Sequence, residues 1–233
     1  MWRKCLLLLL MALVLAACNG ESASKCTSNC VTVNSGVPMT VGSNVKKSEV
    51  RAVANFTAVR LAGAGKVVIE QTGAQSVTVT ADDNLLALFT TGVEDGVLVL
   101  GEAQGKSFTG KQPYYKITVA DVRMLALSGS GEMQAGRLDG AALSISVAGS
   151  GDVTAAGRVG DLTVSISGSG SVKAAGLTAK RAKVTVIGSG DATVNASDEL
   201  DATMSGSGRI WYLGSPTVKT SKSGSGSIEK KSN

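Results

Sequence analysis

Residues 163–172 read TVSISGSGSV, and this unit recurs through most of the chain. Apolar and hydroxyl-bearing residues alternate up to Gly168, and the alternation resumes at Val172 after the tripeptide Gly168-Ser169-Gly170. A period of two is typical of a strand with one buried face, because successive side chains point to opposite sides. The stretch therefore predicts a strand, a tight corner at the tripeptide and a second strand.

The Gly-Ser-Gly corner occurs six times, with its first glycines separated by 20, 19, 20, 18 and 18 residues. Its structural glycines are Gly129, Gly131, Gly149, Gly151, Gly168, Gly170, Gly188, Gly190, Gly206, Gly208, Gly224 and Gly226. A unit this short cannot bury its apolar side alone, so neighbouring units must stack. We therefore predict an all-β solenoid, a parallel β-helix with coils of 18–20 residues, each with a second turn marked by Gly136, Gly157 or Gly176. An antiparallel sandwich also fits the spacing of the turns, but it would not explain why the Gly-Ser-Gly tripeptide recurs at a regular interval.

The two ends of the repeat region are less regular. Gly63-Ala64-Gly65 stands where a first corner is expected, and Glu94-Asp95-Gly96 is a hairpin signal. Residues 82–89 fit either a short helical turn or an irregular strand. In the last coil, Thr220 and Lys222 occupy positions that are apolar elsewhere, which fits a polar cap or a frayed tail.

The N-terminus has the features of an export signal. Arg3 and Lys4 precede an apolar run over residues 6–14, which is shorter than a membrane span and ends in Leu-Ala-Ala-Cys at Cys18. We expect a signal peptide over residues 1–17, a flexible tether over 18–47, the β-helical domain over 48–229 and a tail over 230–233. Cys26 and Cys30 fit a local disulfide in an oxidising compartment.

Composition excludes several functions. The chain has no histidine, which removes His-dependent nucleophilic catalysis and His-ligated zinc. Removal of residues 1–17 would leave 21 basic and 18 acidic residues, a net charge of +3 without a clustered basic face. We expect no nucleic-acid partner, no cofactor and no metal site.

Three groups of residues are candidates for chemistry or binding. Glu132, Asp152 and Asp191 follow their corners at one offset, but Ser and Arg in other coils favour a solvated row over a calcium site. The alternative function is a polysaccharide-binding or polysaccharide-degrading β-helix enzyme, for which carboxylates are available at Asp82, Asp83, Glu94, Asp95, Glu102 and Asp121. Trp211 and Tyr212 fit either an apolar lid over the last coils or an exposed binding patch.

Several motifs together resemble a known family. Val53, Phe56 and Val59, then Gly63-Ala64-Gly65, residues 83–86, the Glu94-Asp95-Gly96 turn and the serial corners are similar to the bacterial head GIN domain family. Its members are described as auto-transporter adhesins, a name that is itself an inference about function. The resemblance implies a right-handed β-helix over roughly residues 50–228 and provides no catalytic residues to transfer.

The four residues ending at Cys18 resemble the lipobox of bacterial lipoproteins, whose cysteine carries lipid; an ordinary signal peptide with an incidental cysteine is the alternative. The resemblance implies lipidation at Cys18, and Asn19 points to the outer membrane. The expected protein is a non-catalytic, lipid-anchored envelope module with adhesin-like or structural function. Its expected partners are the membrane, reached through the N-terminal lipid, and a glycan, an envelope polymer or a second copy of the chain.

Overall fold

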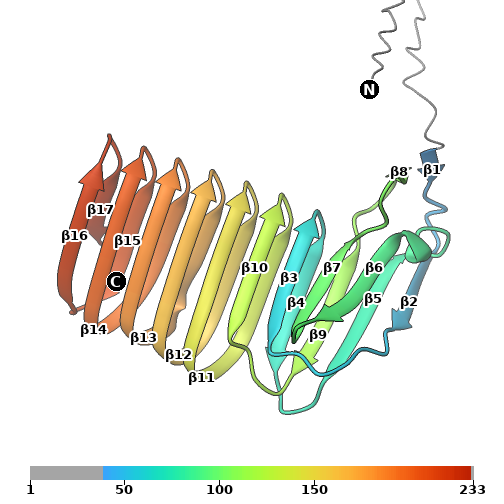
Figure 1. Cartoon of the computed structure of the whole chain (residues 1–233), viewed down its shortest axis with the longest axis horizontal. Helices are drawn as coiled ribbons and strands as arrows, with labels where there is room; N and C mark the ends of the chain where they lie inside the picture. Colours follow the sequence, from blue (N-terminus) through green and yellow to red (C-terminus); the bar gives the residue numbers. More distant parts are fainter. Residues whose placement is uncertain (1–38, 232–233) are drawn as a thin grey trace, which may run out of the picture. The chain divides into compact units, whose positions relative to one another are not determined.

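The computed structural model describes residues 39–231, which form a stack of β-strand coils (Figure 1). Cys18, Cys26, Cys30 and the expected signal peptide lie outside the described residues. The strands are β1 (Met39–Val41), β2 (Lys46–Val50), β3 (Ala58–Gly63), β4 (Lys66–Gln71), β5 (Ser76–Asp82), β6 (Phe89–Glu94), β7 (Val97–Glu102), β8 (Ser107–Thr109), β9 (Tyr114–Val119), β10 (Met124–Gly129), β11 (Glu132–Gly149), β12 (Asp152–Gly168), β13 (Ser171–Gly188), β14 (Asp191–Gly206), β15 (Arg209–Gly214), β16 (Thr217–Ser223) and β17 (Ser227–Lys230). A single 3-10 turn, η1 (Leu86–Leu88), is the only helix in this part of the chain, and no helix there is long and apolar enough to cross a bilayer.

Apart from β1 and β8, which pair with each other, the strands form two facing sheets. Sheet A has the order β6, β7, β3, β10, β11, β12, β13, β14, β16, and sheet B has the order β2, β5, β9, β4, β11, β12, β13, β14, β15, β17. The long strands β11 to β14 belong to both, because their N-terminal halves pair in sheet B and their C-terminal halves pair in sheet A. Neighbouring coils pair in parallel and in register. The predicted all-β solenoid is confirmed, and parallel pairing excludes the sandwich.

The corners align from coil to coil. Gly129 pairs with Gly63 on one side and with Gly149 on the other, and Gly149 pairs in turn with Gly168. Backbone hydrogen bonds connect successive corners, such as the N–H of Ser169 to the carbonyl oxygen of Gly149 at 2.9 Å. The corner carbonyls thus have partners in the next coil, as backbone groups shielded from water require.

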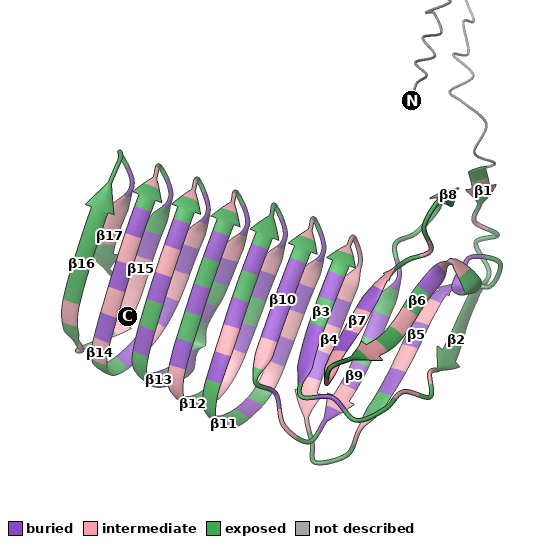
Figure 2. Cartoon of the chain, in the orientation of Figure 1, coloured by how far each residue is buried: buried purple, intermediate pink, exposed green. Residues whose placement is uncertain are grey.

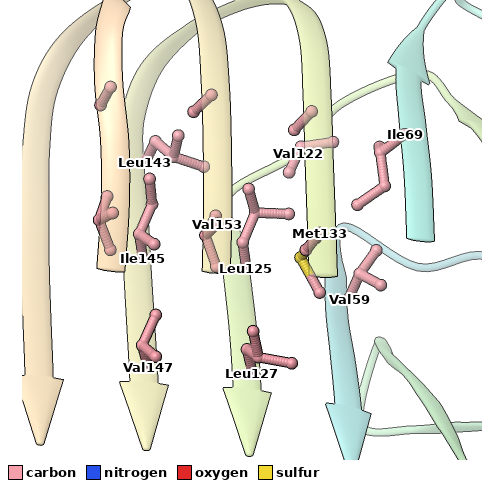
Figure 3. Close-up of a cluster of buried hydrophobic side chains, with 14 of the residues drawn as sticks. Val59, Ile69, Val122, Leu125, Leu127, Met133, Leu143, Ile145, Val147 and Val153 are labelled. Carbon is pink, nitrogen blue, oxygen red and sulfur yellow. The ribbon is translucent and has the colours of Figure 1, made fainter. Parts of the chain in front are cut away.

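The interior consists of apolar rows that run along the stack. Val59, Leu125 and Ile145 are register neighbours in one row, and Leu127 and Val147 belong to the next row (Figure 3). All five are at most 1% exposed. Burial alternates along each long strand (Figure 2), as the period-two pattern predicts. Each such side chain stabilises the fold by about 1.5–3 kcal/mol.

The second bend in the coils of β11, β12 and β13 differs from the expected glycine turn. β11, β12 and β13 continue through it without interruption, and their pairing shifts register after Ala135, Thr154 and Ala174. A β-bulge bends a strand while its pairing continues on both sides, so no turn is needed. The bend has positive φ at Arg137 (58°) and Gly157 (138°) in two different coils.

The N-terminal end of the solenoid is closed by antiparallel strands. β5 pairs antiparallel with both β2 and β9, and β6 and β7 form the expected hairpin, with positive φ at Asp95 (50°) and Gly96 (75°). β1 pairs with β8, so the described fold begins at Met39, and residues 39–47, expected to belong to the tether, are structured. Their sequence gave no strand signal because β2 is an edge strand exposed along its whole length.

The other end of the stack is polar. Thr220 and Lys222 pair with the buried Ala202 and Met204, yet both are exposed because no coil follows them. Unpaired strand edges invite association, and charged side chains on the last coil oppose it. β16 and β17 therefore form the last coil as a polar cap.

Candidate functional site

The corner glycines have a packing role that follows from the stacking. A Cβ on Gly170 would stand 2.5 Å from the carbonyl oxygen of Gly151 and 2.7 Å from Val147 Cγ1. Side-chain carbons do not approach backbone oxygens so closely, so the coils could not stack at this distance with a larger residue.

The row that follows the corners in sheet B consists, from Lys66 to Arg209, of charged residues of both signs and one serine. Its register runs through Lys66, Glu132, Asp152, Ser171, Asp191 and Arg209. Lys66 forms an ion pair with Glu132 at 3.3 Å, and Arg209 forms one with Asp191 at 3.3 Å. Within residues 39–231 no group of three or more acidic or Cys side chains could hold a metal ion. This row fits a solvated, internally paired surface better than a calcium site.

Asp152 is the most strongly bonded carboxylate of this row. It accepts a hydrogen bond from Ser171 Oγ at 2.5 Å and one from Lys173 Nζ at 3.0 Å. These bonds lower the pKa of Asp152, with the Ser171 hydroxyl as the largest cause and partial burial acting against it. Asp152 is therefore a fixed anion whose role is to connect two coils.

A second charged row lies near the other bend, on sheet A. Asp161, Arg181 and Glu199 are register neighbours, and Arg181 Nη2 lies 2.6 Å from Asp161 Oδ1. Glu199 pairs with Lys219 at 3.1 Å. The pKa of Arg181 is raised, chiefly by its hydrogen bond to Asp161. We call Asp161, Arg181, Glu199 and Lys219 the charge ladder.

Two shallow grooves adjoin the charge ladder. One of about 420 Å³ is lined by Asp121, Arg123, Ser144, Asp161 and Thr163, among others. The other, of about 370 Å³, shares Asp161 and Thr163 and extends to Lys183 and Asp201. Because the grooves share residues, they form one trough of mixed polar and apolar lining that crosses several coils.

Sequence analysis missed the charge ladder, although a signal was present. Asp161, Arg181 and Glu199 each stand seven residues before the first glycine of their corner. Comparison of residues one coil apart, instead of neighbours along the chain, would have found these pairs.

The outer side of sheet A above the trough is small and hydroxyl-rich. We call it the hydroxyl face; it consists of Ser144, Ser146, Thr163, Ser165, Ser167, Thr185, Thr203 and Ser205. Ser146, Ser165, Thr185 and Thr203 form one register row across four coils. Ile187, which is 54% exposed, stands in the row of Ser167 and Ser205.

Trp211 and Tyr212 have different roles. Tyr212 is partly buried and packs against the core, as the lid interpretation requires. Trp211 occupies an outward position, and the guanidinium carbon of Arg209 lies 4.7 Å from its ring centroid. The Arg209 guanidinium therefore covers the Trp211 ring, which would have to be exposed in a binding patch.

The carboxylates considered for an enzyme are dispersed. Asp82 is 1% exposed, Asp83 accepts a hydrogen bond from Ser43, and Asp121 pairs with Arg123 at 2.7 Å. Asp95 lies in the β6–β7 hairpin. Asp83 and Asp121 are thus engaged with neighbouring side chains, and Asp95 lies in a turn.

These features define the class: a β-solenoid with a long polar outer face and paired surface charges. The chain belongs to the family described as "Putative auto-transporter adhesin, head GIN domain", whose model matches residues 55–216. The family resemblance seen in the sequence motifs is therefore confirmed.

Solved structures share the fold. The crystal structure of a "putative adhesin" from Bacteroides fragilis is 26% identical with a TM-score of 0.68, covering 82% of this chain and 99% of its own. Two structures from Parabacteroides distasonis are each 24% identical: a "putative lipid binding protein" (TM-score 0.53; 84% of this chain, 100% of its own) and a "putative adhesin" (TM-score 0.52; 83% and 100%). No curated protein sequence matches the chain.

Proposed function

We propose that this protein is a non-catalytic, lipid-anchored module of the cell envelope that binds an extended glycan or envelope polymer along the hydroxyl face and its trough. The observation that carries the proposal is the register of the hydroxyl rows over successive coils. Successive strands stand about 4.8 Å apart, so the face repeats the same polar group at short, even intervals. A repeating polymer can satisfy such a face with many weak contacts.

Two further observations support an adhesin-like role. The family description and the structure from Bacteroides fragilis both name adhesins. Within the described residues, the hydroxyl face presents in-register polar rows over successive coils, which suits contact with an extended partner better than enclosure of a small molecule.

A pair of variants on one strand tests the binding face. Ser165 and Thr154 are both exposed on β12, but Ser165 belongs to sheet A and Thr154 to sheet B. We expect Ser165→Arg to lose binding to isolated envelope polymers and to a glycan array, while Thr154→Arg keeps it. Equal binding by both variants would contradict the assignment of the face.

The anchor and its location are tested separately. Cys18→Ser should move the mature protein from the membrane to the soluble fraction; unchanged fractionation would refute lipidation. Digestion by added protease in intact cells would place the domain outside. Protection until the outer membrane is opened would place it in the periplasm, where a structural role replaces adhesion.

A further inference from the structure

Exposed apolar side chains gather at the N-terminal start of the described chain. Six large hydrophobic residues are exposed in residues 39–231, and four of them lie within residues 39–50: Met39 (60%), Val41 (67%), Val45 (59%) and Val50 (71%). Single exposed apolar residues are normal on protein surfaces, but a local cluster marks an interaction site.

Met39 and Val41 are held in a small ribbon beside the coils. β1 pairs in parallel with β8, with Met39 opposite Ser107 and Val41 opposite Thr109, and Gly42 N–H donates to the carbonyl oxygen of Thr109 at 2.7 Å. Met39 and Val41 are two residues apart on one strand, so their side chains point to the same side. Figure 1 shows β1 and β8 standing apart from the stacked strands.

Four exposed lysines surround these apolar residues. Lys46 and Lys47 follow Val45, and Lys106 and Lys111 flank β8. None of the four forms an ion pair among the described residues, whereas seven other basic residues do. Of the nearby acids, Glu49 pairs with Arg51 and Asp83 accepts a hydrogen bond from Ser43, while Asp82 is buried without a bonded partner among the described residues. The four lysines therefore have no ion-pair partner in this part of the chain, although the charge of Lys47 helps to lower the pKa of Asp83.

We infer that this surface, defined as Met39, Val41, Val45, Lys46, Lys47, Lys106 and Lys111 and called the ribbon surface, rests on an anionic phospholipid bilayer. Apolar side chains that enter the headgroup region and lysines that meet anionic headgroups are the combination that interfacial binding needs. The inference rests on the proposed lipid anchor in one respect. A lipid anchor at Cys18, close to Met39 in the chain, would hold the ribbon surface near the bilayer.

Lysine labelling of the intact, lipidated protein tests the inference. The protein is reconstituted into phosphatidylcholine vesicles with and without phosphatidylglycerol, exposed briefly to an amine-reactive acetylating reagent and analysed by mass spectrometry. Phosphatidylglycerol should slow labelling of Lys106 and Lys111 by about fivefold, and high salt should reverse the effect. Lys183 and Lys222, exposed on distant coils, are internal controls and should label equally in both vesicles.

Vesicle flotation separates this inference from the proposed anchor. Flotation with neutral vesicles and equal labelling of all lysines would support the anchor and refute the ribbon surface. Flotation only with anionic vesicles, lost at high salt, would support the ribbon surface and refute the anchor. If the ribbon lysines became protected from labelling as the protein concentration rose in detergent without vesicles, the surface would bind a second copy of the chain. That outcome would overturn the inference. Absence of flotation with either vesicle would refute both.

A matched pair of variants locates the effect. Lys106→Gln with Lys111→Gln should abolish the effect of phosphatidylglycerol on Lys46 and Lys47, whereas Lys183→Gln with Lys222→Gln should leave it intact. Equal protection of Lys46 and Lys47 in both double variants would contradict a role for the ribbon lysines.

Discussion

A Cβ on Gly168 would stand only 2.6 Å from the carbonyl oxygen of Gly149 in the preceding coil. Gly168 also has a φ of 120°, a region that residues with a side chain rarely adopt. Contact and conformation therefore both require glycine at this corner.

Substitution at this corner should destabilise the protein strongly. We expect Gly168→Ala to lower the free energy of unfolding by about 3 kcal/mol or more, from backbone strain and overpacking together. For a chain of this size that lowers the Tm by about 10 °C. The control is Gly136→Ala, because a Cβ there meets no atom within 4 Å. Equal Tm values for the two variants would refute the packing role of the corner.

Asp152 should make stability depend on acid pH. Its pKa is lowered in the folded protein, chiefly by the Ser171 hydroxyl, so its contribution is full above its ordinary pKa of 3.8 and is lost as pH falls through the folded pKa. Ser171→Ala removes the largest cause. We expect this variant to lower the Tm more at pH 7 than at pH 2, measured by thermal unfolding at both. An identical loss at both pH values would contradict the assigned cause.

Asp82 and Asp83 should respond oppositely to the same change. Asp82 is buried, and neither of its carboxylate oxygens has a hydrogen-bond partner among residues 39–231, whereas Asp83 accepts bonds from Ser43 and from its neighbour Asn84. Asp82→Asn removes an unpaired buried carboxylate and should raise the free energy of unfolding by about 1 kcal/mol or more. Asp83→Asn should lower it, and denaturant titration compares the two. A loss of stability in Asp82→Asn would mean that this carboxylate has a stabilising partner.

The polar end of the stack should keep the protein monomeric. Lys222 is the register neighbour of Met204, so Lys222→Leu would continue an apolar row to an open sheet edge. We expect this variant to associate as its concentration rises, as measured by light scattering after size exclusion. Thr163→Leu, at an exposed outward position of β12, is the control and should stay monomeric. Monomeric behaviour of Lys222→Leu would show that this end needs no charged cap.

The regular part of the fold could be predicted because each coil repeats the same pattern of apolar positions and glycine corners. Rows such as Leu127, Val147 and Ile166 were visible in the sequence and are the buried rows of the structure. The arrangement of the N-terminal strands could not be predicted, because their order in the sheets differs from their order along the chain. β2, with the sequence KKSEV, gives no period-two pattern because both of its faces are exposed.

The candidate site was less accessible to sequence analysis than the fold. Asp161 and Arg181 are 20 residues apart and meet only because one coil has that length. The continuous second bend was also unexpected, since bulged strands of small residues have the same composition as turns.

The spatial order at the N-terminal end has a consequence for how the chain assembles. The coil of β7 and β9 lies outside that of β3 and β4, although it comes later in the chain, so β3 and β4 are enclosed only once residue 119 is present. The next coil pairs with β3 and β4, 66 residues earlier, as Met124 opposite Ala58 shows. Each later coil pairs with a predecessor about 20 residues earlier, a short loop to close. Residues 39–119 therefore form a template that precedes the regular repeats in the chain. Evolution can lengthen or shorten such a chain by whole coils without rebuilding that template.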